Sequence, residues 1–360
     1  MKKASARERE RDIGVKLRTS RKSYRRVGAF AAGAFLTLST ASLSHAGPLL
    51  FVGDGGTFTL QTYNGTTGAF IGEDGAGGSI GFPTGIAIGP DGNVYLGDGG
   101  NGAVLRFSGA NGSFLGQFIT PGSGLISPSG LAFGFGNLYA ADFGTGGNSF
   151  INVYNGTTGA FVTQFGAGAP NGGLFDPNGI AFGPAGLYVA DQINGVDVYD
   201  PITGAFVSVL VPLGSGPGAP AGLADPSGMA IGPDGLLYVA DETNGLVDRF
   251  NATTGAFLGV FGATNSLSAP IDLTFGPDGN LYVTDANGVE RFNGSTGASL
   301  GAFVPAGGNL VNAQYLAFST PVPEPTTFAL LAFGAAVVVG FRKRRYSRCT
   351  AGTAFTARRV

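Results

Sequence analysis

Short apolar runs separated by turn residues recur along the middle of the chain. In the clearest copy, an apolar run at 228–231 is followed by a Pro-Asp-Gly turn and by a second apolar run at 237–240. Because proline presets φ for a turn and glycine tolerates positive φ, these two runs are predicted to form antiparallel strands of a hairpin. A third run ends at Phe250, and a fourth follows a second turn at 256–261. Each copy therefore predicts four short strands.

This pattern is an internal repeat with a nearly constant period. Successive copies start 45, 49, 49 and 44 residues apart, at Pro83, Pro128, Pro177, Pro226 and Pro270. A sixth copy is split: residues 50–54 and 63–70 match its last three strands, and residues 314–318 supply its first. Four-stranded units repeated every ~40–50 residues predict an all-β fold, a six-bladed β-propeller. The blade shared between the N- and C-terminal strands closes the predicted ring.

The repeated sequence also resembles a known family. Pro-x-Gly-(Ile/Leu)-Ala, followed by Leu-Tyr-Val-Ala-Asp, is similar to the NHL-type repeat of six-bladed propellers, and the resemblance covers residues 48–319. It leaves function open, because one fold hosts many functions. We assign the propeller domain to residues 47–320. One aromatic position of the second strand is predicted to pack between blades, and it is occupied by Tyr95, Tyr139, Tyr188, Tyr238 and Tyr282.

The N-terminal segment has the features of an export signal. Residues 1–26 are rich in lysine and arginine, residues 27–43 are apolar and small, and Ser44-His45-Ala46 fits a small-x-small cleavage site. This order predicts a signal peptide over residues 1–46 that is removed after Ala46. The alternative is an uncleaved anchor of similar length.

The C-terminal segment combines three features. Pro323, Glu324 and Pro325 are followed by an apolar stretch at 328–341 and a basic cluster at 342–345. Residues 321–345 therefore resemble a PEP-CTERM sorting signal with a short transmembrane helix. The resemblance implies export, transient anchoring in the membrane, processing by an exosortase, and display at the cell surface or in the extracellular matrix. An ordinary C-terminal membrane anchor is the alternative, and residues 346–360 form a basic extension.

The propeller domain is strongly acidic. Residues 47–322 contain 19 aspartates and glutamates but only three cations, Arg106, Arg249 and Arg291, which gives a net charge of −16. Such a domain repels phosphate backbones, and this excludes nucleic acid as a partner. A domain without lysine also lacks the lysine of a phosphate-binding P-loop. We expect the propeller to be a monomer.

The distribution of histidine and cysteine limits the enzyme chemistry. Some six-bladed relatives are enzymes, namely amidating-enzyme lyases, lactonases and streptogramin-type lyases, and several of them need histidine. The one histidine here, His45, lies in the predicted signal peptide, and the one cysteine, Cys349, follows the sorting segment. These positions exclude zinc sites built from Cys and His, thiol nucleophiles and Ser-His-Asp triads from the propeller. A metal-dependent lyase or lactonase that uses pore carboxylates stays open as an alternative.

An aspartate ends the second strand of every blade. The six are Asp54, Asp98, Asp142, Asp191, Asp241 and Asp285. They could form an acidic face that binds Ca²⁺, a cation that prefers oxygen ligands. Alternatively, each carboxylate caps the following turn by accepting hydrogen bonds from backbone N–H groups.

Polar residues at the start of the inner strands mark a candidate binding site at the pore mouth. They are Thr84, Ser129, Asn178, Ser227 and Gln314, and in the fifth copy of the repeat Asp272 replaces the usual glycine. Converging polar groups could hold a metal or a small ligand there, whereas a solvated channel rim is the other interpretation. We assign no cofactor, no resident metal and no catalytic residue.

Taken together, these features predict an exported, non-enzymatic binding module. The strands are constant in length, whereas the loops between blades vary, at 120–127, 166–176, 211–225 and 262–269. Rigid blades that carry variable loops suit recognition. The expected partner is an extracellular protein or polysaccharide.

Overall fold

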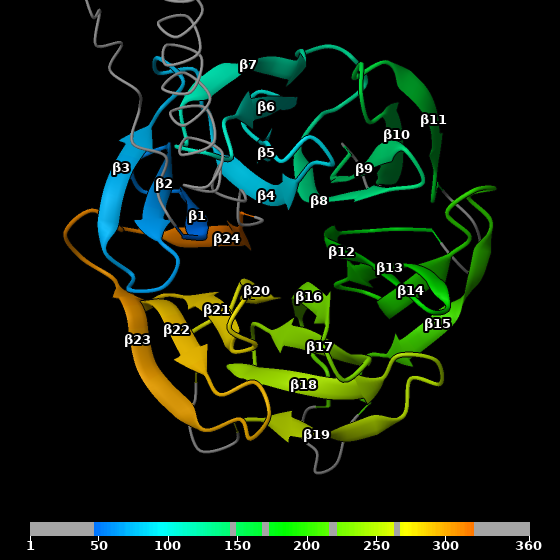
Figure 1. Ribbon diagram of the computed structural model, residues 1–360. Coiled ribbons are helices and arrows are strands. Elements are labelled where there is room, and N and C mark those ends of the chain that lie inside the picture. Colours follow the sequence, from blue (N-terminus) through cyan, green and yellow to red (C-terminus); the bar gives the residue numbers. More distant parts are fainter. Residues whose placement is uncertain (1–46, 145–148, 168–172, 216–221, 263–266, 320–360) are drawn as a thin grey trace, which may run out of the picture. The chain divides into compact units, whose positions relative to one another are not determined.

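The computed structural model describes residues 47–144, 149–167, 173–215, 222–262 and 267–319. Within these residues, six four-stranded antiparallel sheets form a ring, and each sheet is one blade (Figure 1). The prediction of an all-β, six-bladed propeller is therefore confirmed.

Each of the first three blades has one strand next to the axis and three farther out. Blade 1 consists, from the axis outward, of β24 (Ala313–Phe318), β1 (Leu49–Asp54), β2 (Thr59–Asn64) and β3 (Phe70–Asp74). Blade 2 consists of β4 (Pro83–Ile88), β5 (Val94–Asp98), β6 (Ala103–Phe107) and β7 (Phe114–Ile119). Blade 3 consists of β8 (Pro128–Gly134), β9 (Asn137–Asp142), β10 (Phe150–Asn155) and β11 (Phe161–Phe165).

The other three blades follow the same order. Blade 4 consists of β12 (Pro177–Gly183), β13 (Gly186–Asp191), β14 (Gly195–Tyr199) and β15 (Phe206–Pro212). Blade 5 consists of β16 (Pro226–Ile231), β17 (Leu236–Asp241), β18 (Leu246–Asn251) and β19 (Phe257–Phe261). Blade 6 consists of β20 (Asp272–Phe275), β21 (Leu281–Asp285), β22 (Gly288–Phe292) and β23 (Ser299–Pro305).

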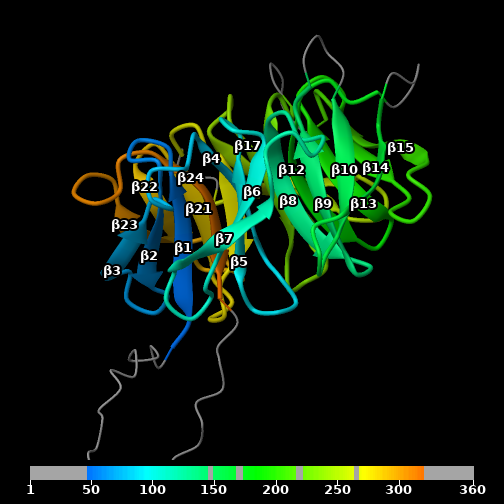
Figure 2. The same ribbon diagram turned by 90° about the horizontal axis from the view of Figure 1, so that it is seen from above.

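Both ends of the described chain meet in blade 1. β24 pairs antiparallel with β1, with Leu50 opposite Phe318 and Val52 opposite Leu316. Figure 2 shows the two strands side by side although they come from opposite ends of the domain. The pairing leaves no open arc in the ring, as the split repeat predicted.

The core lies between neighbouring blades rather than inside one sheet. The second-strand tyrosines are almost completely buried, and Tyr95 makes edge-on ring contacts with Phe118 of its own blade and Phe133 of the next blade, with ring centroids 4.8 and 4.7 Å apart. Tyr282 contacts Phe318 of blade 1 in the same way. The predicted packing of these aromatics between blades is confirmed.

The terminal segments are outside the described residues. The predicted signal peptide, the sorting segment and the C-terminal extension fall within residues 1–46 and 320–360. Among the described residues, no helix is long and apolar enough to cross a membrane.

Candidate functional site

The two ends of each blade are built differently. The loop face is the end at which the inner strand begins and the second strand finishes, and there the chain passes from one blade to the next. The turn face is the opposite end, where a hairpin turn joins the inner strand to the second strand. Figure 2 shows the ring from the side, with the strands running between these two faces.

On the loop face, the six repeated aspartates are buried and at most 1 % exposed. Their carboxylates accept hydrogen bonds from the backbone of the loop that leads into their own blade. Asp142 accepts from the N–H groups of Ile126 and Ser127, at 3.0 and 2.7 Å. Asp54 accepts from Val311 N–H at 3.0 Å, a residue 257 positions away in the chain. Each aspartate therefore fixes the entry of the chain into its blade.

Of the two roles that the sequence left open for these aspartates, the structure shows the capping role. Asp191 accepts hydrogen bonds from the N–H groups of Ile193 and Asn194, in the turn that follows it, and from Phe175 in the loop before the blade. The capping thus reaches further than the following turn. Burial raises the pKa of Asp142, although the N–H groups of Ser127 and Ile126 oppose this shift.

The loops that these aspartates hold present large apolar side chains to solvent. Five residues whose N–H groups bind a buried aspartate are 37–55 % exposed, and we term them the apolar rim: Phe82, Ile126, Phe175, Ile193 and Val311. Hydrogen bonds from their backbone N–H groups to the buried carboxylates limit the conformations of the rim before any partner binds. Preorganisation of this kind reduces the entropy that binding costs.

Three of the predicted pore-mouth residues join neighbouring blades. The hydroxyl groups of Thr84 and Ser227 donate to the carbonyl groups of Pro128 and Ile271, each at 2.7 Å. Ser129 donates in the same way to Pro177. These hydroxyls bind backbone of the next blade, so they hold the ring together at the pore mouth.

The other predicted residues differ in their surroundings. Asn178 is half-buried at the second position of β12, and the side-chain amide of buried Gln314 donates to Asn312 at 3.0 Å. Asp272 is the one predicted residue among the lining residues of the central channel.

We term the residues at the third position of each repeat copy, counted from the proline or its equivalent Ala313, the neck of the channel. Four blades have glycine there and two have a side chain: Gly85, Gly130, Gly179, Gly228, Asp272 and Tyr315. The glycines are needed because the inner strands approach closely. A Cβ on Gly85 would lie 2.1 Å from the carbonyl oxygen of Ser129, and one on Gly130 would lie 2.2 Å from that of Asn178.

Blade 6 departs from the other blades at this position. In blade 5 the register between the first two strands shifts between Pro226 and Met229, whereas in blade 6 the pairing is regular through Asp272 and Thr284. The Asp272 carboxylate accepts a hydrogen bond from Leu316 N–H of blade 1 at 3.1 Å. Burial raises the pKa of Asp272 to about 7 against the effect of this hydrogen bond.

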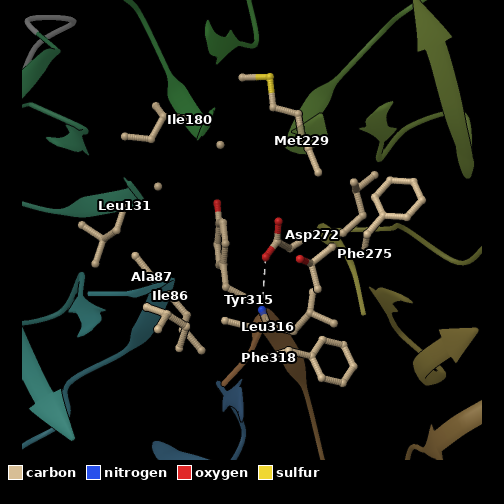
Figure 3. Close-up of a pocket in the computed structure, with 17 residues that line it drawn as sticks. Ile86, Ala87, Leu131, Ile180, Met229, Asp272, Phe275, Tyr315, Leu316 and Phe318 are labelled. Carbon is tan, nitrogen blue, oxygen red and sulfur yellow. Dashed lines mark hydrogen bonds between the residues drawn. The ribbon is translucent and has the colours of Figure 1, made fainter. Parts of the chain in front are cut away.

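Tyr315 is the second side chain in the neck, and sequence reasoning did not identify it. Its ring extends from β24 into the channel, toward Ile180 and Met229 on the opposite side (Figure 3). Tyr315 is 8 % exposed, and no hydrogen-bond partner of its hydroxyl is found in the described part of the chain. Burial raises its pKa, and the carboxylates of Asp272, Glu242 and Asp176 add to this effect. The channel beside Tyr315 encloses a cavity of about 290 Å³.

Three further carboxylates lie at the loop face, and we term them the loop-face carboxylates. Asp176 and Asp225 immediately precede the inner strands β12 and β16, and Glu242 follows β17. Glu242 N–H donates to the carbonyl of Asp225 at 2.9 Å, which places the two residues side by side. All three are half-buried, and burial raises the pKa of each. Comparing the residue before the proline of each repeat would have pointed to two of them.

The carboxylates do not converge on a point. Within the ranges that the structure describes, no group of three His, Cys, Asp or Glu side chains is placed to hold a metal ion.

Comparisons with known proteins identify two motifs. The NHL repeat model matches residues 223–250, and the model of the PEP-CTERM protein-sorting motif matches residues 321–345. No curated protein sequence matches the chain. The sorting motif indicates an exported protein that is anchored in the membrane before processing, and it implies recognition by an exosortase.

Solved structures share the fold at low sequence identity. A chain of a nidogen/laminin complex is 19 % identical with a TM-score of 0.58, over 76 % of this chain and 99 % of that one. A catalytically inactive histidine-to-alanine variant of virginiamycin B lyase from Staphylococcus aureus, solved with quinupristin, is 17 % identical with a TM-score of 0.51, over 71 % and 84 %. A Bacteroides caccae protein of unknown function is 13 % identical with a TM-score of 0.58, over 76 % and 99 %. The chain is thus a six-bladed β-propeller in which residues 223–250 match the NHL repeat and residues 321–345 match the PEP-CTERM protein-sorting motif.

Proposed function

We propose that this protein is a non-enzymatic binding module that holds an extracellular protein or polysaccharide against its loop face after export. The observation that carries the proposal is the apolar rim. Its five large side chains are exposed to solvent while their backbone is held by buried aspartates. Exposed apolar side chains on a restrained backbone suit recognition, because little conformational entropy is lost when a partner binds them.

Two comparisons support binding over catalysis. The nidogen/laminin structure is a complex between two proteins, in which the matched chain has this fold. The lyase structure is of a variant that loses catalysis when a histidine is replaced, whereas residues 47–319 of the present chain contain no histidine. The Asp272 carboxylate, which the enzyme alternative would use, is engaged by Leu316 N–H.

An array of extracellular proteins and polysaccharides, probed with the purified mature protein, tests the proposal. We expect a retained partner, and we expect the rim variants Ile126→Ser and Phe175→Ser to reduce its retention by about tenfold, because each removes an exposed apolar contact. Ile202→Ser is the matched control, since Ile202 is 76 % exposed but lies in the turn between β14 and β15, at the turn face.

Two results would contradict the proposal. One is an array without any retained partner. The other is turnover of lactone or streptogramin substrates that stops when a chelator is added and returns with metal, because that result would favour the enzyme alternative.

A further inference from the structure

The cavity in the central channel has an apolar wall. Four blades each contribute the fourth residue of their repeat copy to it, and these side chains are Ile86, Leu131, Ile180 and Met229. They are 6–8 % exposed, and Figure 3 shows them around the open centre of the channel. The volume of about 290 Å³ is close to the lower end of the range for small-molecule pockets. The wall therefore suits the apolar body of a small ligand.

The hydroxyl of Tyr315 is a polar group inside this apolar cavity. The Tyr315 side chain is more than nine-tenths buried, yet its hydroxyl has no hydrogen-bond partner among the residues that the structure describes. Figure 3 shows it pointing into the open channel rather than into a blade. Polar groups at this depth are normally paired, so a molecule that occupies the channel is the natural partner of this hydroxyl.

The Asp272 carboxylate is a second polar group that faces the same space. Its Oδ2 accepts the hydrogen bond from Leu316 N–H at 3.1 Å, and Figure 3 shows the other oxygen turned toward the channel, on the same side as the Tyr315 hydroxyl. Gly228 leaves room for this oxygen, since a Cβ there would lie 2.2 Å from Oδ1. A carboxylate has about four acceptor positions, so Asp272 can accept a further donor from the channel.

The charge of the domain favours a cation in the cavity. None of the described residues that line it is a lysine or an arginine. The three arginines of residues 47–322 lie on the third strands of their blades, and the guanidinium of Arg249, for example, lies over the ring of Phe261, 5.6 Å from the ring centroid. Negative potential is focused in a narrow channel with apolar walls. The Asp272 carboxylate therefore lacks a cationic partner that a ligand could supply.

We propose that the channel binds a small primary amine, in its ammonium form, that carries a short apolar body. The ammonium group donates to Asp272 Oδ1 and to the Tyr315 hydroxyl, and the apolar body lies against Leu131, Ile180 and Met229. An ammonium group has three donors, so it can serve both acceptors at once. The apolar body displaces water from the wall of the cavity. This site is separate from the loop face that the proposed function uses.

Isothermal titration calorimetry on the purified mature protein at about pH 8 tests the proposal, because hexylamine is an ammonium ion at that pH. The probes are n-hexylamine, 1-hexanol, which has the same body and an uncharged head, and n-butylamine, which has the same head and a shorter body. We expect hexylamine to bind at least about tenfold more tightly than hexanol, through charge-assisted hydrogen bonds. It should also bind on the order of tenfold more tightly than butylamine, which buries two fewer methylene groups. Hexanol that binds as tightly as hexylamine, or hexylamine that does not bind at about 10 mM, overturns the proposal.

Variants locate the amine. Asp272→Asn keeps the size of the side chain and an oxygen for Leu316 N–H, and it should weaken hexylamine binding at least about tenfold while leaving hexanol binding within about twofold. Tyr315→Phe should weaken hexylamine binding severalfold, because one acceptor is lost. Asp200→Asn is the matched control, since it removes the same charge at the turn face.

An equal loss of hexylamine binding in Asp200→Asn and Asp272→Asn would show a general charge effect and contradict the site. Unchanged melting temperatures establish that the variants are folded. If Asp272→Asn does not fold, the comparison of hexylamine with hexanol on the unmodified protein decides the question. The array and the titration are independent: a retained partner without hexylamine binding refutes this inference alone, and hexylamine binding without a retained partner refutes the proposed function alone.

Discussion

On the turn face, aspartates cap turns within a few residues of themselves, whereas on the loop face they connect distant parts of the chain. Asp91 accepts hydrogen bonds from Asn93 and from the Tyr95 hydroxyl, two and four residues away. Asp142 accepts from Ile126 and Ser127, 16 and 15 residues away, and from the Asn152 amide. Both carboxylates accept hydrogen bonds, but the donors of Asp142 lie much farther away along the chain than those of Asp91.

The pKa values of the two aspartates reflect their burial. Partial burial opposes ionisation of Asp91, but the hydrogen bonds from Asn93 and Tyr95 outweigh it and lower its pKa. For Asp142, burial outweighs hydrogen bonds of the same kind and raises the pKa. A partly exposed aspartate such as Asp91 therefore stabilises its own turn. A buried aspartate such as Asp142 fixes the loop that leads into its blade, although burying its carboxylate costs desolvation energy.

Replacing a buried cap should show the largest difference between the two faces. Asp142→Ala leaves two buried N–H groups and the Asn152 amide without an acceptor, so we expect the free energy of unfolding to fall by about 4 kcal/mol. Asp91→Ala should lower it by about 1 kcal/mol, since water can replace the carboxylate at a partly exposed turn. Urea denaturation of both variants measures the difference. Similar losses in the two variants would show that burial of the loop-face caps does not matter.

Much of the fold could be predicted because the same sequence pattern occurs in six copies, one for each blade. Apolar runs and the terminal aspartate recur with a nearly constant period, and a Pro-Asp-Gly turn joins the first two strands in three copies. The split copy predicted the pairing of β24 with β1. The capping role of the aspartates was foreseen as one of two interpretations. Their actual partners, such as Val311 for Asp54, depend on ring closure and on loops of unequal length, which no local pattern describes.

The candidate site was predicted only in part because it lies where the repeat is broken. Asp272 was recognised because it replaces a glycine at a repeated position. Tyr315 occupies the same position in the split copy, where its alignment to the other copies is least evident. Asp176 and Asp225 lie one residue before the repeated proline, and Glu242 one residue after the repeated aspartate, at positions that vary from blade to blade. Neither position belongs to the pattern that defines the fold.

A second expected effect concerns pH and the acids buried near the loop face. Asp248 on β18 is 4 % exposed, and burial, with the nearby Asp241 carboxylate, raises its pKa to about 7. An aspartate whose pKa is raised in the folded state stabilises the fold below pH ~4 and loses this contribution as the pH rises to about 7. Asp248→Asn should therefore raise the free energy of unfolding at pH 8 by an amount on the order of 3 kcal/mol and change it little at pH 4.

Thermal unfolding of the wild type and of Asp248→Asn at pH 4 and pH 8 checks this expectation. Asp200→Asn serves as the control at the turn face. Hydrogen bonds from the N–H groups of Thr203 and Ile202 lower the pKa of Asp200, so this substitution should bring no gain at pH 8. A gain from Asp248→Asn that is equally large at pH 4 would show that ionisation is not its cause.

The smallest expected effect concerns the two reasons why glycine is required in this fold. In the neck the inner strands approach closely, and in the turns the backbone has positive φ. Gly130→Ala should cost about 2 kcal/mol, because the new Cβ would lie 2.2 Å from the Asn178 carbonyl oxygen of the next blade. Gly235 at the turn face has φ +77° and open space around its Cβ position, so Gly235→Ala should cost about 1 kcal/mol through backbone strain alone.

Asparagine distinguishes these two causes, because it tolerates the left-handed region better than alanine but has a larger side chain. Gly235→Asn should recover most of the loss caused by Gly235→Ala, whereas Gly130→Asn should be worse than Gly130→Ala. Denaturation midpoints of the four variants provide the measurement. If asparagine were tolerated equally at both positions, the neck could widen to accept a side chain in any blade, and the side chains of Asp272 and Tyr315 would no longer require a local departure from the repeat.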